Sequence, residues 1–455
     1  MATAVASVAE VCRAAKRASR TLARLDSAVK DAALEAIAAA LTERTAEILV
    51  ANVRDMQLGV EDEIGDALLD RLRLDESRIA QIAGAVRQIA ALPDPVGEVI
   101  DGRRLPNGLD VRKVRVPLGV VAVVYEARPN VTIDAAALCL KSGNAIVLRG
   151  SSSAEHSNAA LAQIASEAAV AAGLPDGAVS LVAGGGRAEL SELATQRDSV
   201  DLIIPRGGEG LKDALQAVAT VPVIYAASGN CHVYVDASAD QAQAEAIVLN
   251  AKLQRPGVCN AVETLLVHAD AAPSFVPRVV RALTDAGVVV RGDERVLELA
   301  RDESERAQAD AGGAQPDDAP RDREASLEAE ASLSDSALVQ AASEEDWATE
   351  YLALTLAVGV VDSTEQAIEH IGRYGSGHSE AIVTRDAGAA RAFGLGVDAA
   401  CVYVNASTRF TDGGEFGMGA EIGNSTQKLH ARGPIGLREL CTFKYLVEGD
   451  GHVRA

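Results

Sequence analysis

The fold of the chain is decided by residues 120–153, which read VVAVVYEARPNVTIDAAALCLKSGNAIVLRGSSS. An apolar run at Val120–Val124 is followed by a polar turn, a helical stretch near 132–141 and a second apolar run at Ala145–Leu148. Short apolar runs that alternate with helical stretches are typical of a parallel sheet whose strands are joined by helices. We therefore expect a parallel strand–helix–strand unit in this segment.

Apolar runs and helical stretches go on alternating through most of the chain. They predict an α/β fold with two doubly wound parallel-sheet domains, preceded by amphipathic helices over residues 1 to about 95. The further strands are expected at Val179–Val182, Leu202–Ile204 and Val223–Tyr225 in the first domain, and at His232–Val235, Thr264–Val267, Val288–Val290, Leu354–Val361, Ala381–Val383 and Cys401–Val404 in the second.

Length, charge and hydropathy narrow the class of protein. The chain has 455 residues, enough for two or three domains with cores of their own. Its net charge of −22 argues against a nucleic-acid partner, because phosphate binding requires a basic surface. No uninterrupted apolar run of about 18 residues occurs, so we expect no membrane span. The start of the chain lacks the apolar block of a secretory signal, and we expect a cytoplasmic protein.

One segment differs from the rest in composition. Residues 302–346 hold 14 acidic residues against three arginines, and are otherwise rich in Ala, Ser, Gly and Gln. Such a segment cannot bury enough apolar surface to order itself. We interpret it as a disordered acidic insertion in the second domain, without an assigned function.

The six cysteines are scattered, with no CxxC pair, so we expect neither a disulfide framework nor a metal site. Cys259 differs from the others in its setting. A helical stretch ends near Gln254, and Pro256 and Gly257 then force a turn before the cysteine. A turn near a helix end, next to the cation of Arg255, favours a reactive thiolate. The alternative is an inert, buried cysteine, which is the commoner case.

Glycine, serine and arginine gather in the loops after the strands of the first domain. Ligands of open parallel sheets bind at this edge, and helices that begin there hold phosphates. The GxGxxG fingerprint is missing, so a standard Rossmann dehydrogenase is disfavoured. The loop of Arg149, Gly150 and Ser152 has no carboxylate, which favours the 2′-phosphate of NADP(H) over NAD(H). The candidate cofactor-binding residues are Arg149, Gly150, Ser152, Pro205, Gly207 and Gly208.

Together with Cys259, these loops resemble the γ-glutamyl phosphate reductase family, a branch of the aldehyde dehydrogenase superfamily. The matching segments follow the family order over essentially the whole chain outside the acidic insertion. They are VPLG (116–119), YEARPNVT (125–132), KSGNA (141–145), PRGG (205–208), QRPGVCNA (254–261), ETLL (263–266), NASTRFTDGGEFG (405–417) and STQKLHARGP (425–434).

The resemblance implies a reaction and roles for three residues. The reaction is the NADPH-dependent reduction of L-glutamate 5-phosphate to L-glutamate 5-semialdehyde with release of phosphate, the second step of proline biosynthesis from glutamate. Cys259 matches the nucleophile that forms a thioester. Asn130 matches a side-chain amide that helps to hold the oxyanion, and Glu350 matches a carboxylate that contacts the ribose of the nicotinamide half.

The resemblance also implies a domain organisation and a homo-oligomer. The NADP(H)-binding domain would be 1–97 with 117–230, and the catalytic domain 231–404 with the insertion at 302–346. An oligomerisation element would combine 98–116 with 431–455, and a linker over 405–430 would contribute to the active site. Association with a glutamate kinase that hands over the labile acyl phosphate is left open.

Some assignments have competing interpretations. Arg409 and Arg128 are candidate contacts for the anionic substrate, although a surface arginine is the ordinary alternative. Ala226 stands where hydrolytic aldehyde dehydrogenases carry a glutamate general base, while Glu263 is near enough to Cys259 in sequence to need a structural test. Rival functions are a hydrolytic or CoA-acylating aldehyde dehydrogenase and a catalytically dead scaffold.

Overall fold

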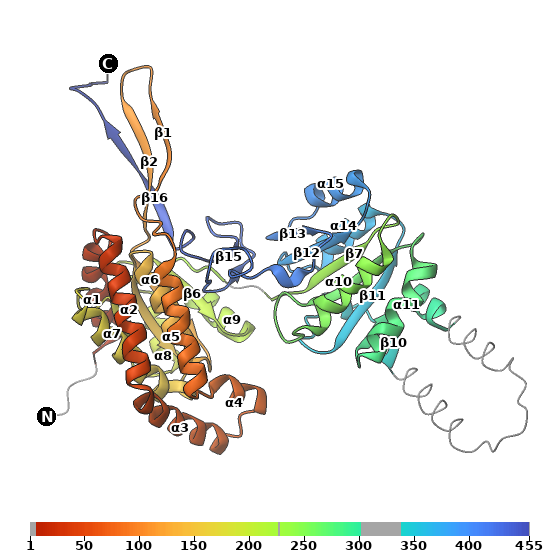
Figure 1. Cartoon of the computed structure of the whole chain (residues 1–455), viewed down its shortest axis with the longest axis horizontal. Helices are drawn as coiled ribbons and strands as arrows, with labels where there is room; N and C mark the ends of the chain where they lie inside the picture. The colour runs from red at the N-terminus through yellow and green to blue at the C-terminus, as the bar shows by residue number, and fades with distance from the viewer. Residues whose placement is uncertain (1–5, 226–227, 302–337, 455) are drawn as a thin grey trace, which may run out of the picture. The chain divides into compact units, whose positions relative to one another are not determined.

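The computed structural model describes residues 6–225, 228–301 and 338–454. The chain divides into two compact units, which we call the first unit (1–226 with 413–455) and the second unit (227–412) (Figure 1). Each has its own parallel sheet, so the predicted α/β fold with two parallel-sheet domains is confirmed. Within the described ranges, no helix is long and apolar enough to cross a membrane.

The sheet of the first unit has four parallel strands in the order β5-β4-β3-β6. Every residue of β3 and β4 is buried, which explains why their sequences are nearly continuous apolar runs. The order reverses at β3, and ligands of open sheets bind beside such a reversal. The predicted fifth strand at Val223–Tyr225 is wrong: among the described residues this segment forms a single isolated bridge, between Ile203 and Val223. The strands are β3 Val120–Tyr125, β4 Ala145–Gly150, β5 Val179–Leu181 and β6 Leu202–Arg206.

Nine helices of the first unit's described residues cover this sheet or pack around it. Helices α6, α7 and α8 connect successive strands and α9 follows β6, as the sequence predicts. The five N-terminal helices are amphipathic: α2 packs on α5 and α7 and buries Leu34, Ile37 and Leu41. The helices are α1 Val8–Leu22, α2 Ser27–Glu43, α3 Thr45–Glu61, α4 Asp66–Leu72, α5 Glu76–Ala91, α6 Pro129–Lys141, α7 Glu155–Ala171, α8 Arg187–Ala194 and α9 Glu209–Val218.

A three-stranded antiparallel arm projects from the first unit (Figure 1). The hairpin of β1 (Val99–Arg104) and β2 (Asp110–Pro117) is completed by β16 (Cys441–Glu448) from the C-terminal segment. A short pair, β14 (Asn424–Ser425) with β15 (Gly433–Pro434), precedes β16. Segments far apart in the sequence therefore build one arm.

The second unit has a seven-stranded, all-parallel sheet in the order β10-β9-β11-β8-β7-β12-β13. Six strands lie where the sequence predicts them, and β10 forms within the last part of the segment that we expected to be disordered. Residues 302–337 of that predicted insertion lie outside the described residues. The strands are β7 Cys231–Val235, β8 Val262–His268, β9 Val289–Gly292, β10 Val339–Ala341, β11 Thr355–Val361, β12 Ser379–Val383 and β13 Cys401–Val404.

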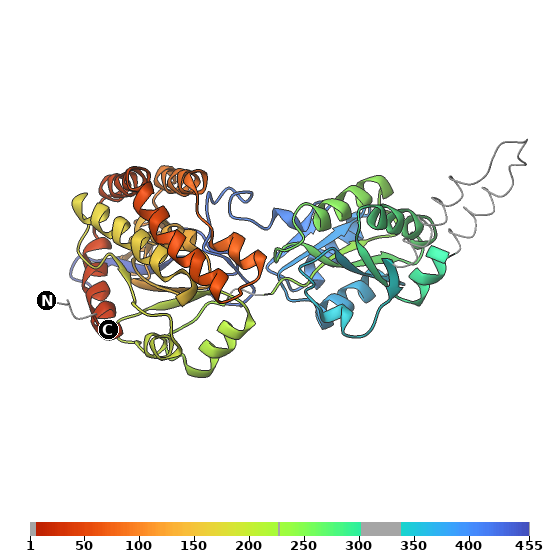
Figure 2. The same cartoon turned by 90° about the horizontal axis from the view of Figure 1, so that it is seen from below.

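Two layers of helices cover the two faces of this sheet (Figure 2). Helices α10 (Gln241–Leu253) and α11 (Ala272–Asp285) share one core cluster with Val233 and Val235 of β7. Helices α14 (Thr364–Tyr374) and α15 (Ala387–Gly396) share another with Tyr234, the residue between those valines. Alternate residues of one strand thus face opposite layers, as expected for a strand buried on both sides.

Candidate active site

Cys259 lies on the turn between α10 and β8, at the amino end of a buried parallel strand. The turn is closed by the Ala261 amide, which donates to the Val258 carbonyl at 3.0 Å. Cys259 is half-buried, whereas the other five cysteines are buried; all six lie in the described ranges, and none forms a disulfide. Cys259 is therefore the thiol that a substrate can reach.

The backbone of Cys259 rests directly on the start of β7. A Cβ built on Gly229 would overlap the carbonyl group of Cys259 and lie 2.6 Å from its Cα. The Cys231 thiol donates to the same carbonyl oxygen, with a sulfur–oxygen distance of 3.1 Å. The Gly229 amide in turn donates to Glu350 Oε1 at 2.6 Å. This packing fixes where the Cys259 backbone lies, and it explains the glycine at 229.

A buried ion pair supports the same region. Lys252 at the end of α10 and Glu263 on β8 are fully buried, and Lys252 Nζ donates to Glu263 Oε2 at 2.6 Å. The other carboxylate oxygen, Oε1, accepts from the Leu352 amide at 3.2 Å, where the backbone adopts a φ of 52°. Burial raises the pKa of Glu263 to about 7, against the opposing effect of Lys252. Oε2 of Glu263 is thus engaged with Lys252 and Oε1 with the segment that carries Glu350, which argues against a role in activating water.

Arg409 lies beside the cysteine turn within the second unit. It belongs to a short 3₁₀ helix, Thr408–Phe410. Asn260, the residue after Cys259, links the cysteine turn to this segment, because its Nδ2 donates to the Thr411 carbonyl at 2.9 Å. Arg409 Nε donates to Gln254 Oε1 at 2.8 Å.

The positive charges of Arg409 and Arg255 lie close together next to the cysteine turn. Burial and the charge of Arg255 lower the pKa of Arg409, while Cys259 acts in the opposite direction. The sequence predicts Arg255 only as a cation that favours the Cys259 thiolate, and its position near Arg409 is a contact that the sequence does not reveal. The pair gives the surroundings of Cys259 a positive potential suited to an anionic substrate.

The loops after the four strands of the first unit interlock at one edge of their sheet. Arg149 is buried, and its Nη2 donates to the carbonyls of Gly185 and Gly186, both at 2.6 Å. A Cβ on Gly207 would lie 2.5 Å from Glu126 Oε2, the atom that accepts from the Gly208 amide at 3.0 Å. Arg149 therefore holds the loop of Gly185 and Gly186 in place. The sequence did not predict this contact.

This edge has the features of a phosphate-binding site. Helices α8 and α9 begin after Gly186 and Gly208, and neither has a side-chain cap at its first turn. Their amide groups and the positive ends of their dipoles suit an anion such as a pyrophosphate. Ser152 is exposed beside them, and a Cβ on Gly150 would overlap the Asn158 amide. The residues present thus fit a bound dinucleotide.

The predicted site residues form two groups. At the edge of the first unit's sheet the structure gathers Arg149, Gly150, Ser152, Pro205, Gly207 and Gly208 with Arg128 and Asn130, which lie at the start of α6. In the second unit it gathers Cys259, Glu350 and Arg409 near the amino ends of that unit's own strands. Ala226, the position expected to lack a general base, lies outside the described residues. No cluster of three or more His, Cys, Asp or Glu in the described part of the chain could hold a metal ion.

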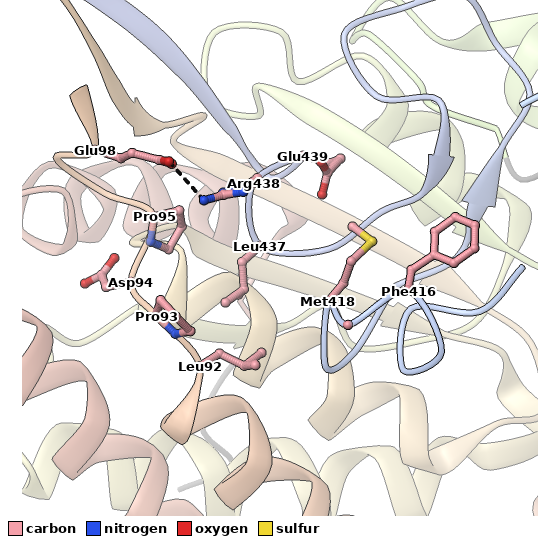
Figure 3. A pocket seen from close by; sticks show the side chains of 11 residues that line it. Leu92, Pro93, Asp94, Pro95, Glu98, Phe416, Met418, Leu437, Arg438 and Glu439 are labelled. Atoms are coloured by element: carbon pink, nitrogen blue, oxygen red, sulfur yellow. Dashed lines mark hydrogen bonds and ion pairs between the residues drawn. The ribbon is translucent and has the colours of Figure 1, made fainter. Parts of the chain in front are cut away.

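A separate cavity of about 620 Å³ lies in the first unit at the base of the arm (Figure 3). Its three acidic wall residues are already paired: Asp94 with Lys30, Glu98 with Arg438 at 2.9 Å, and Glu439 with the Gly436 amide at 3.0 Å. Leu92 and Met418 contribute an apolar part of the wall. None of the predicted site residues lines this cavity, and we assign it no role in the chemistry.

Comparison with known proteins gives a consistent result. Residues 1–297 match the aldehyde dehydrogenase family. The chain is 52% identical to the γ-glutamyl phosphate reductase of Thermobifida fusca over 98% of both chains. The crystal structure of the γ-glutamyl phosphate reductase from Thermotoga maritima is similar, with a TM-score of 0.89 and 42% identity over 99% of this chain and 100% of that one. An acetylating aldehyde dehydrogenase from Geobacillus thermoglucosidasius, 22% identical with a TM-score of 0.66 over 98% of this chain and 97% of that one, shares the fold.

Proposed function

Since the chain belongs to the γ-glutamyl phosphate reductases of the aldehyde dehydrogenase family, we propose that it reduces L-glutamate 5-phosphate to L-glutamate 5-semialdehyde and releases phosphate, with NADPH as the reductant. This is the second step of proline biosynthesis from glutamate, and we place it in the cytoplasm. The observation that carries the proposal is a half-buried Cys259 near Arg409, which itself lies near Arg255, in a chain that matches these reductases over nearly its whole length.

Cys259 begins the reaction as the nucleophile. Its thiolate attacks the carbonyl carbon of the acyl phosphate, and the carbonyl oxygen becomes an oxyanion. The Asn130 side-chain amide and the Cys259 backbone amide are the proposed donors to that oxygen. Removing one such donor typically raises the barrier by about 3–4 kcal/mol. Gly229 and Cys231 support this step indirectly, because they fix the backbone on which the thiol is carried.

Collapse of the oxyanion expels phosphate and leaves a thioester on Cys259. Arg409 and Arg255 are the proposed contacts for the phosphate and the substrate carboxylate, because Arg409 interacts electrostatically with both Arg255 and the Cys259 thiol. Arg128 is the corresponding candidate in the first unit. The thioester must last until it is reduced, and a base that activates water would hydrolyse it first, so a reductase gains by lacking such a base. Glu263 is engaged with Lys252 and Leu352, which supports this interpretation.

When bound, NADPH supplies the hydride that converts the thioester to the aldehyde. Arg149, Gly150, Ser152, Pro205, Gly207 and Gly208 are the residues proposed to hold it, with Glu350 at the nicotinamide ribose. Ser151, Ser152 and Ser153 beside Arg149 favour the 2′-phosphate of NADPH, since these loop residues offer hydroxyl donors and no carboxylate. Fluorescence titration with NADPH and NADH tests this preference, and tighter binding of NADH would refute it.

The arm is the element that we propose for self-association. Strand β16 lies at the edge of its sheet and is eight residues long. Phe443, Tyr445 and Val447 on it are 45%, 60% and 54% exposed. An edge strand with exposed apolar side chains tends to pair with another chain. We propose a homo-oligomer, and a glutamate kinase as a possible further partner that delivers the acyl phosphate.

The reverse reaction tests the proposed function directly. Purified protein should reduce NADP⁺ with glutamate 5-semialdehyde only when phosphate is present, because phosphate must cleave the thioester. NADP⁺ reduction without phosphate would indicate a hydrolytic aldehyde dehydrogenase, and a requirement for coenzyme A would indicate an acylating one. A Cys259→Ala variant should lose the reaction, and an unchanged rate in that variant would contradict the thioester.

A further inference from the structure

We propose that Asp134 is a positioning residue: it holds the side-chain amide of Asn130 so that one N–H stays available to donate to the developing oxyanion. The inference rests on the proposed function, in which Asn130 donates to that oxyanion. Asp134 itself does not touch the substrate; it acts through Asn130.

The geometry of α6 brings the two side chains together. Pro129 begins the helix and Asn130 is its second residue, so Asn130 lies in the first turn. Asp134 follows four residues later, on the same face. Asn130 Nδ2 donates to Asp134 Oδ2 at 2.9 Å. Asn130 is exposed and Asp134 is half-buried, so the carboxylate lies beneath the amide and leaves the amide's outer side open.

A carboxylate fixes which end of an amide faces it. A side-chain amide has a donor end and an acceptor end of nearly the same shape, and by rotating 180° an unrestrained asparagine exchanges them. An ionised carboxylate only accepts, so it selects the NH₂ end of Asn130. The second hydrogen of that NH₂ group then remains for the oxyanion. Without Asp134, the Asn130 carbonyl oxygen can turn toward the developing negative charge and repel it.

The charge of Asp134 is maintained by its surroundings. Arg206, at the end of β6, attracts the carboxylate and, like the hydrogen bond from Asn130, opposes the effect of burial. Burial raises the pKa of Asp134 to about 6, which leaves the group ionised at neutral pH. An ionised acceptor also polarises the amide, and this strengthens the remaining N–H as a donor.

A double-mutant cycle tests the inference, with kcat and the KM for L-glutamate 5-phosphate as readouts. Asn130→Ala should lower kcat by roughly 10²- to 10³-fold, as expected when one oxyanion donor is lost. Asp134→Ala should lower kcat by about 10-fold or more with little change in KM, because the interaction is made only in the transition state. Asp134→Asn keeps an acceptor oxygen but can also turn its own NH₂ group toward Asn130, so it should recover only part of the rate. The double variant Asn130→Ala/Asp134→Ala should have the same kcat as Asn130→Ala alone.

The outcomes separate the inference from the proposed function. If Asn130→Ala keeps the wild-type kcat, the oxyanion role fails, and the positioning role fails with it. If Asn130→Ala is impaired and Asp134→Ala is not, only the positioning inference is refuted. Additive losses in the double variant would assign Asp134 a structural role instead. Asp134→Ser, whose hydroxyl is too short to reach Asn130, replaces Asp134→Ala if that variant does not fold, with the same expected loss of kcat.

Discussion

Gly229 and Cys259 approach so closely that no side chain can be placed between them: a Cβ on Gly229 would overlap the Cys259 carbonyl group. A Gly229→Ala variant must therefore displace the cysteine turn or the start of β7. A displacement of about 1 Å at a reacting group can cost roughly 10²-fold in rate. We expect kcat to fall by about that factor in steady-state assays, with the protein still folded.

Gly372 in α14 provides the matched control for this substitution. A Cβ there meets nothing within 4 Å, and the position is helical and in the same unit. Gly372→Ala should leave kcat unchanged and raise the free energy of unfolding by about 0.4–1 kcal/mol, because alanine restricts the unfolded chain. Full activity of Gly229→Ala would show that the turn can shift without affecting the chemistry.

Thiol labelling should distinguish Cys259 from the other five cysteines. Because those five are buried, brief treatment of the folded protein with iodoacetamide should add one carboxamidomethyl group per chain, at Cys259. Burial also raises the pKa of Cys12 to about 11 and that of Cys231 well above its usual value, which keeps both thiols protonated. Mass spectrometry of the intact protein and of its peptides gives the number and the site.

Two controls accompany the labelling. Cys259→Ala should remain unlabelled when folded, and denatured wild-type protein should take up six groups, one for each cysteine. L-Glutamate 5-phosphate should slow the labelling, because it occupies the same site. A single adduct on any other cysteine would mean that Cys259 is not the accessible nucleophile.

Most of the fold could be predicted because its strands are buried on both faces. Such strands are unbroken apolar runs, as at Val120–Val124, and local sequence is enough to identify them. Val223–Tyr225 has the same composition but makes one bridge, since pairing depends on a neighbour that composition does not reveal. Strand β10 was missed for the opposite reason: Val339–Ala341 is short and largely exposed, and it lies next to an acidic segment.

The candidate site could be predicted in part. The rule that ligands bind at the carboxyl ends of parallel strands pointed to the loops of the first unit, which the structure does bring together at one edge of the sheet, and their role in binding stays a prediction. It does not locate Cys259, which precedes its strand, and there the Pro256-Gly257 turn was the usable signal. Contacts between residues far apart in the sequence could not be predicted. Nothing in the sequence links Arg149 to the carbonyl of Gly185, or Gly229 to Cys259.

Replacing one member of the buried ion pair of Lys252 and Glu263 should lower the free energy of unfolding. Lys252→Met leaves a buried carboxyl group without its cation, which typically destabilises a protein by about 3–5 kcal/mol. Urea unfolding followed by circular dichroism measures this loss. Replacing both residues, as in Lys252→Met with Glu263→Leu, should restore much of the stability. If Lys252→Met is as stable as the wild type, the ion pair does not contribute to the free energy of unfolding.

The same variant should show a characteristic pH dependence. Burial already raises the pKa of Glu263 from its usual 4.5 to about 7, and loss of Lys252 raises it further. The folded state then binds a proton that the unfolded state releases, so the contribution of Glu263 to stability falls as pH rises above 4.5. The destabilisation by Lys252→Met should therefore be larger at pH 8 than at pH 5. Equal losses at both values would show that Glu263 is not the group responsible.

Arg409 should govern the binding of anions next to Cys259. Its Nε is held by Gln254, and its charge lies beside Arg255 and the thiol. Arg409→Leu removes a charge-assisted contact of about 1.5–3 kcal/mol, so the KM for phosphate in the reverse reaction should rise by roughly 10- to 150-fold. Arg373→Leu, an exposed arginine of the same unit on α14, is the matched control and should leave that KM unchanged. Equal effects of the two substitutions would indicate a general loss of positive potential, and an unchanged KM in Arg409→Leu would place the phosphate elsewhere.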